Sequence, residues 1–191
     1  MSQQPEPSGF DHDFRNAVNW LYLLANAHAT CITMFIRHSF GTNVPGFSGL
    51  FAILMMLLVM AESNDITMLW FLYAWLIALV CQRLRTGYLY ARGHREHSEY
   101  SGWPYLAMRI PFTKSESQAK NQEPSLCLLL GLLLCPLSPT VGLFVMAGIV
   151  SLTIVRCMNQ FAISRQVTAM RDMQIEQQAM SERMRGLRKD F

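Results

Sequence analysis

The densest group of residues that could do chemistry is the stretch 93–100, Gly-His-Arg-Glu-His-Ser-Glu-Tyr, which combines imidazoles with carboxylates. On a helix His94 and His97 would share one face, and Glu96 or Glu99 would complete a three-ligand metal or acid–base site. The spacing matches no established zinc motif, and a His-x-x-His pair arises easily in a polar loop. His94, His97 and Glu99 are therefore weak metal candidates. The favoured interpretation is a hydrated loop that faces lipid headgroups and holds no cofactor.

Other chemically capable residues are sparse. His28 is the one charged or histidine residue inside an apolar segment, and no acidic residue lies within one turn of it. We expect it to hydrogen-bond to a neighbouring helix rather than to relay protons. All five cysteines lie in or at the ends of apolar segments, where they act as small hydrophobic residues. The sequence has no phosphate-binding loop, dinucleotide fingerprint, His-Glu-x-x-His helix or Gly-x-Ser-x-Gly elbow, which excludes a soluble enzymatic domain.

The elements that position these residues are apolar stretches too extensive for a soluble domain of this size. Of 191 residues 51% are hydrophobic and 15% are charged, whereas an ordinary soluble domain has about 25% charged residues. A membrane-spanning helix needs about 20 predominantly apolar residues. The sequence predicts an all-α, polytopic helical membrane protein with four to five membrane segments at 17–36, 47–61, 66–81, 126–137 and 141–155.

Two pairs of these segments are predicted to form hairpins. The turn Glu62-Ser63-Asn64-Asp65 separates the second and third segments and contains helix-capping residues. Pro136 and Pro139 interrupt the run 126–155 near its middle. The first arm of this second hairpin is the weakest span. If it does not cross, it is a re-entrant piece buried against its neighbours, because unpaired backbone cannot face lipid.

Lysine and arginine concentrate in the loop 83–124 and in the tail. By the positive-inside rule both are cytoplasmic, with the turns 62–65 and 136–139 on the far side. The expected location is a bacterial inner (plasma) membrane. The predicted divisions are a polar N-terminal tail (1–14), membrane segments (15–82), a basic cytoplasmic loop (83–124), a membrane hairpin (125–157) and a C-terminal helix (158–191).

The first segment is amphipathic. Its polar residues recur at spacings of three, four and seven and form one stripe, made of Asn16, Asn19, Asn26, Thr30, Thr33 and Arg37. Two arrangements remain open. In one, the helix lies in the membrane interface and both termini are cytoplasmic; in the other, it spans with the stripe turned into the bundle and the N-terminus outside.

The loop 83–124 interleaves aromatic with basic residues. Such a pattern can stack nucleic-acid bases, but beside a membrane helix Tyr and Trp suit the headgroup layer and Arg attracts anionic lipid. Membrane lipid is therefore the expected partner and nucleic acid is not. The headgroup candidates are Arg83, Arg85, Arg92, Arg95, Trp103 and Arg109. The polar stretch 114–124 is predicted to be a mobile linker.

The tail carries a heptad pattern. Six of its eight a and d positions are apolar, and the eight are Ile163, Gln166, Met170, Met173, Gln177, Met180, Met184 and Leu187. With Glu176 and Arg183 at g positions, this resembles a short coiled-coil seam continuing from the last membrane segment. The alternative is a lone amphipathic helix on the membrane or on the loop.

The pattern as a whole predicts a small non-enzymatic integral membrane protein that serves as an anchor, scaffold or assembly subunit. Its loop and C-terminal helix would bind another protein or a second copy, and the helix residues that would do so are Met170, Met173, Met180, Met184 and Leu187. The competing hypothesis is a membrane-embedded enzyme or small-solute channel. It would use the polar face of the first helix together with His94, Glu96, His97 and Glu99.

Overall fold

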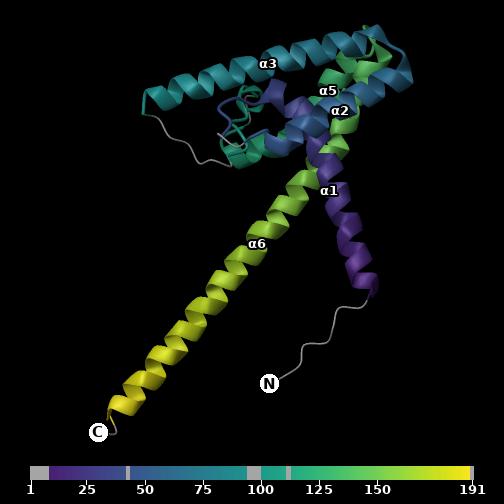
Figure 1. The fold of residues 1–191 in the computed structure, drawn as a ribbon. Helices are drawn as coiled ribbons and strands as arrows, with labels where there is room; N and C mark the ends of the chain where they lie inside the picture. The colour runs from purple at the N-terminus through teal and green to yellow at the C-terminus, as the bar shows by residue number, and fades with distance from the viewer. Residues whose placement is uncertain (1–8, 42–43, 94–99, 111–112, 190–191) are drawn as a thin grey trace. The chain divides into compact units, whose positions relative to one another are not determined.

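A computed structural model describes residues 9–41, 44–93, 100–110 and 113–189. The chain divides into two compact units, Met1–Val155 and Arg156–Phe191. The regular structure of the described residues is helical throughout (Figure 1), which confirms the prediction of an all-α fold. In chain order the helices are α1 (Gly9–Ile36), α2 (Gly46–Ser63), α3 (Ile66–Ala91), α4 (Tyr105–Met108), α5 (Glu116–Leu134) and α6 (Pro139–Lys189).

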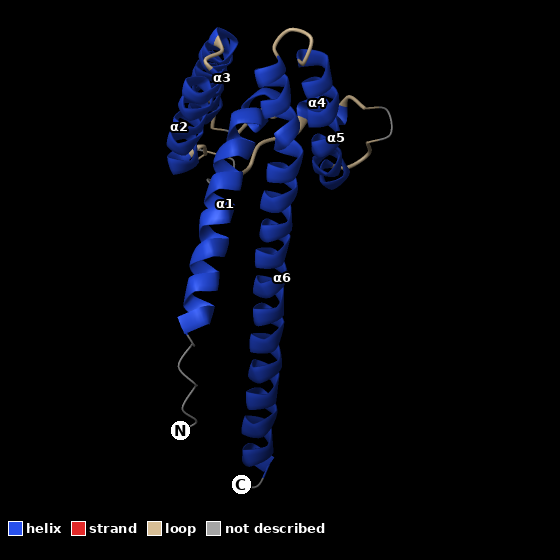
Figure 2. Ribbon diagram, turned by 90° about the vertical axis from the view of Figure 1, so that its right-hand side faces the viewer, coloured by secondary structure: helices blue, strands red, loops and turns tan. Residues whose placement is uncertain are grey.

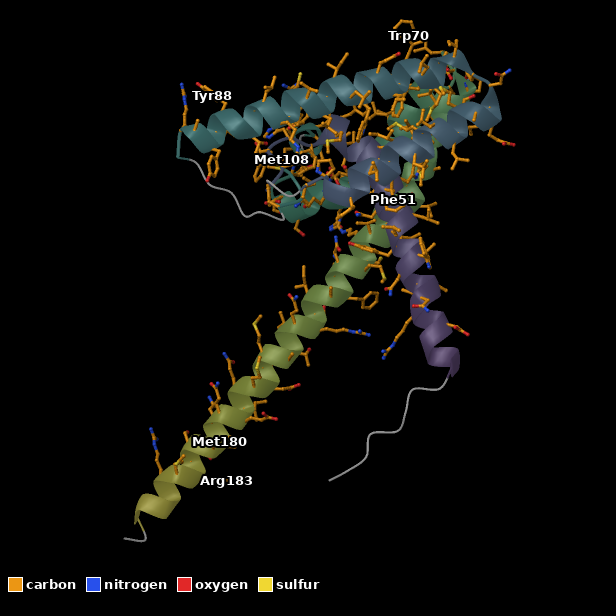
Figure 3. The ribbon with its side chains drawn as sticks, viewed as in Figure 1. Phe51, Trp70, Tyr88, Met108, Met180 and Arg183 are labelled. Carbon is orange, nitrogen blue, oxygen red and sulfur yellow. The ribbon has the colours of Figure 1, made fainter. Side chains whose placement is uncertain are left out.

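Three of the described helices, α2, α3 and α6, are long and apolar enough to cross a membrane. The large exposed side chains of α2 and of the first part of α3 are mostly apolar, as lipid-facing surfaces are. On α2 and α3 these include Leu50, Leu54, Leu58, Trp70, Ile77 and Val80. Trp70 projects outward from α3 in Figure 3. The helices α1 and α5, which correspond to the first and fourth predicted segments, are not among the helices that are apolar enough to cross a membrane.

Capping residues explain why α2 and α3 form a hairpin. Asn64 ends α2 in the left-handed conformation, and its N–H donates to the Met60 carbonyl. Asp65 begins α3 and accepts a hydrogen bond of 3.0 Å from the Thr67 N–H. Both are helix-terminating interactions of the ordinary kind, so this turn follows directly from its local sequence.

Helices α5 and α6 form the second hairpin, and the predicted proline-containing turn joins them. The Ser138 N–H donates to the Leu134 carbonyl at 2.9 Å, and Pro139 is the first residue of α6, where its missing N–H is not needed. Glycines let the two arms approach closely. A Cβ atom at Gly142 would lie 2.8 Å from the Cys135 backbone, and one at Gly131 would lie 2.9 Å from the Gly142 carbonyl oxygen.

The two turns hydrogen-bond to each other. The Thr67 hydroxyl donates to the Ser138 hydroxyl oxygen at 2.6 Å, and Ser138 donates in turn to the Asp65 carboxylate at 3.0 Å. Both turns lie at the same end of the Met1–Val155 unit, as Figure 2 shows. The chain that leaves α3 at the opposite end must therefore return along α5 before α6 begins.

The C-terminal half of α1 is the centre of this unit. Nearly all side chains of 25–36 are buried, whereas Asn16 and Asn19 near its start are exposed. Thr30 accepts a hydrogen bond of 3.3 Å at its carbonyl from the Trp75 indole of α3. The Cys31 thiol lies 3.6 Å from the Ala52 carbonyl of α2. The predicted polar stripe is therefore divided along the helix, with one half exposed and the other inside the bundle.

The loop after α1 pairs with part of the predicted basic loop. His38 and Trp103 exchange backbone hydrogen bonds of 3.0 and 2.6 Å, and the Gly41 N–H donates to Tyr100 at 2.9 Å. Gly102 has a φ of +87°, and a side chain there would meet the Phe40 ring. The stretch 100–103 is thus a folded part of the Met1–Val155 unit.

The prediction of a mobile linker at 114–124 is wrong. The Ser115 hydroxyl caps α5 by accepting from the Gln118 N–H at 3.3 Å, and the helix begins at Glu116. Its buried residues recur every four positions, at Ala119, Glu123, Cys127 and Gly131. This stripe packs into the bundle, so the polar composition of 114–124 reflects the exposed face of a helix.

Candidate functional site

The predicted partner-binding seam lies on the part of α6 that belongs to the Arg156–Phe191 unit. All described side chains from 159 to 185 are exposed there. Met170 and Met173 are 57% and 55% exposed, and Met180 and Met184 are 66% and 70% exposed. Figure 3 shows Met180 and Arg183 projecting from this helix. The side chain of Leu187, the fifth predicted contact, lies outside the described residues.

The seam exposes more apolar side chains than a helix face in contact with water normally carries. Exposed single apolar residues are ordinary, but a row at alternating three- and four-residue spacing along one face is typical of a helix that binds another surface. Ile163 continues the row toward the apolar part of α6 and is 59% exposed. Gln166 and Gln177 occupy the two polar positions of the row. The row is therefore interrupted by amides that can both donate and accept hydrogen bonds.

The predicted headgroup residues differ in their surroundings. Arg83, Arg85 and Arg109 have exposed side chains. The Arg92 guanidinium lies over the Tyr88 ring, 4.5 Å from its centroid, at the C-terminal end of α3 where Figure 3 labels Tyr88. Trp103 is 37% exposed although its backbone pairs with His38. Arg95 lies outside the described residues.

The weak metal or catalytic candidates His94, Glu96, His97 and Glu99 also lie outside the described residues. Among the residues the structure does describe, no group of three or more His, Cys, Asp or Glu side chains could hold a metal ion. All five cysteines are free thiols. Cys31 and Cys127 are buried in the helix packing.

A buried ion pair is the charged site that sequence reasoning missed. The Arg37 Nε donates to Glu123 Oε1 at 2.7 Å, and its Nη2 donates to Glu123 Oε2, so the pair is bidentate. The third nitrogen of the guanidinium donates to the Ser101 carbonyl at 3.0 Å. Glu123 is only 1% exposed. The pair joins the end of α1 to α5 and to the folded stretch 100–103.

Partly exposed polar groups surround this ion pair. Lys120 donates to Glu116 at 2.7 Å and to the Ser101 hydroxyl at 3.2 Å, while the Tyr100 hydroxyl donates to Glu116 at 2.8 Å. On α3, the Gln82 amide donates to the Arg37 carbonyl at 2.8 Å. Every charge in this cluster has an opposite partner, so the arrangement is suited to holding four segments together. One sequence signal could have found it, because Glu123 lies in register with the apolar residues Ala119 and Cys127.

The prediction that His28 hydrogen-bonds to a neighbouring helix is confirmed. Its Nε2 lies 3.1 Å from the Phe144 carbonyl, and its Nδ1 lies 2.6 Å from the Ser151 hydroxyl. Because a carbonyl only accepts, Nε2 carries the proton, and Ser151 then donates to Nδ1. Ile32, one turn further along α1, meets the same patch of α6 at Gly148. Helix α1 thus packs against α6 at a point where a glycine permits close approach.

No protein-family model, curated protein or solved structure matches this chain.

Proposed function

We propose that this chain is a non-enzymatic membrane-embedded assembly subunit that presents the tail of α6 as a docking helix for another protein chain. The observation that carries this proposal is the exposed seam of Met170, Met173, Met180 and Met184 on a helix that is continuous with a membrane-length apolar segment. A single helix with an unpacked apolar stripe has little stability of its own in water, since most helix stability comes from packing that stripe.

The proposed topology has four crossings, by α2, α3, α5 and α6. It is supported by the hydrogen bonds between Thr67, Ser138 and Asp65, because two turns at one end of the unit require α5 to return across it. Helix α1 is not counted, because it is not among the helices apolar enough to cross and, unlike for α5, no pair of turns requires it to cross. The loop between α3 and α5 and the tail then share one side, and their Lys and Arg residues favour the cytoplasm.

The polar core supports an anchoring role. The ion pair of Arg37 and Glu123 and the bond between His28 and Ser151 join segments that are far apart in the chain. They hold the helices of the Met1–Val155 unit together. Thr30, on the predicted polar face of α1, is 7% exposed, and its hydroxyl lies 3.3 Å from the Ser48 hydroxyl of α2, so it belongs to the helix packing. That observation favours an anchor over a channel lined by this face.

Site-specific photocrosslinking in native membranes tests the docking proposal. A benzoylphenylalanine at position 173 lies on the seam, and one at position 175 lies on the opposite face. Met173 and Ile175 are 55% and 58% exposed, so the two positions are matched in accessibility and differ in face. The proposal predicts protein adducts from position 173 and few from position 175. Equal yields, or none at either position, would overturn it.

A further inference from the structure

We infer that the occupant of the α6 seam is a second copy of this chain, aligned parallel and in register beside the first in the same membrane. This inference rests on the proposed function, because it names the partner of that same seam. It draws on three features of the tail: its covalent continuity with the membrane segment, the chemistry of its polar seam positions, and the charges that flank the seam.

Continuity fixes the direction and the level of pairing. Helix α6 runs from Pro139 to Lys189 without a break, so the tail is covalently continuous with the apolar segment. Two copies inserted in one membrane point the same way and begin at the same depth. Equivalent residues, such as Met173 of each copy, then lie at the same height above the membrane and can pair directly. An antiparallel pair would need two opposed membranes.

The polar seam positions favour a partner of identical sequence. In register, Gln177 at an a position faces Gln177 of the second copy, and Gln166 faces its own equivalent. An amide carries both donors and an acceptor, so two identical amides can satisfy each other. A polar pair at one a position is a known means of fixing register in coiled coils. A purely apolar groove or a lipid surface would leave these amides buried without partners.

The flanking charges permit this pairing along most of the seam. In a parallel coiled coil a g residue faces the e residue five positions later on the other chain. Along the tail these pairs are Ala162 with Val167, Ala169 with Gln174, Glu176 with Ser181 and Arg183 with Arg188, so like charges meet only in the last pair.

Disulfide trapping in membrane vesicles tests the identity and register of the partner. Cys81 and Cys157 are the exposed native cysteines, and replacing both by serine removes background reaction. In that background we compare Met173→Cys with Ile175→Cys under mild oxidation. A covalent dimer that forms several times faster at position 173 supports the inference. Equal rates at both positions, or dimers at neither, would overturn it.

The photocrosslinking experiment separates this outcome from failure of the proposed function. An adduct from position 173 whose mass is that of two copies supports both proposals. An adduct with a different protein overturns the identity of the partner and leaves the docking function standing. The lack of any face-specific adduct overturns both.

A charge test at Ser181 distinguishes parallel pairing from other arrangements. In register, Ser181→Arg would face Glu176 of the second copy and strengthen self-association a few-fold, whereas Ser181→Glu would weaken it by a similar factor. The two variants differ only in charge at one exposed position, so neither disturbs the membrane unit. Self-association is measured by energy transfer between labelled copies in vesicles. Identical effects of the two variants would overturn the parallel register.

Discussion

The guanidinium group of Arg37 and the carboxylate of Glu123 face each other as a bidentate ion pair across 86 positions of sequence. The Arg37 side chain is 13% exposed and that of Glu123 is 2% exposed, so water screens this pair poorly. The attraction must offset the loss of hydration of both ions. The main consequence is that neither residue can be removed alone without leaving a buried charge in the bundle.

Glu123→Gln should therefore destabilise the protein by about 3–5 kcal/mol, the usual cost of stranding one charge of a buried pair. The matched control is Glu116→Gln on the same helix, whose pair with Lys120 is partly exposed and is worth about 0–1 kcal/mol. Thermal unfolding in detergent measures both variants. Equal losses of stability in the two single variants would contradict the assigned burial of Glu123. The double variant Arg37→Met with Glu123→Leu should recover much of the stability lost by Glu123→Gln, because it leaves no unpaired charge.

Gly142→Ala should destabilise the hairpin of α5 and α6, because the added methyl group would meet the Cys135 backbone at 2.8 Å. Overpacking of this kind costs about 1–3 kcal/mol. Gly87→Ala is the control, since a Cβ there meets nothing within 4 Å, and alanine favours a helix over glycine by about 1 kcal/mol. We expect the melting temperature to fall for the first variant and to stay or rise for the second. A fall for both would point to a general sensitivity of these helices.

The turn between α2 and α3 should make stability depend on acidity. Hydrogen bonding by the Thr67 N–H and then by the hydroxyls of Thr67, Thr140 and Ser138 lowers the pKa of Asp65 to about 2. Its folded pKa is below the unfolded value of about 3.9, so the stabilisation is complete above pH 4 and is lost as pH falls toward 2. Asp65→Asn should flatten the melting temperature over this window. An unchanged pH profile in the variant would refute the assignment.

The proposed topology predicts which positions share a side of the membrane. Single cysteines at Glu62, Lys114 and Ser181 can be labelled with an impermeant maleimide in oriented vesicles, in the background without exposed native cysteines. We expect positions 114 and 181 to react from one side and position 62 from the other. Reaction of all three from one side would exclude the crossing by α5.

Local patterns in the sequence were sufficient for several features of the fold. The capping residues Asn64 and Asp65 predicted one hairpin, and Pro136 and Pro139 predicted the other. His28 had to find a hydrogen-bond partner because an unpartnered imidazole is costly inside an apolar bundle. These features depend on interactions within a few residues or on the cost of burial alone.

Other features could not be predicted because they depend on segments far apart in the chain. The backbone pairing of His38 with Trp103 and the ion pair of Arg37 with Glu123 have no local signature. Helix α5 was predicted to start too late because its first residues are polar, although the four-residue spacing of Ala119 and Cys127 around Glu123 marks a buried stripe. The seam on α6 was visible in the heptads, but no local pattern identifies what occupies it.

The most direct measurement of the central claim is amide hydrogen exchange of the tail in lipid vesicles at increasing lipid-to-protein ratios. If the seam pairs with a second copy, amides around Met173 and Met180 are protected at low lipid ratio and lose protection as the copies are diluted. Peptides from α2 and α3 should not change. Protection that is independent of dilution, or exchange that is fast at every ratio, would contradict pairing of the tail.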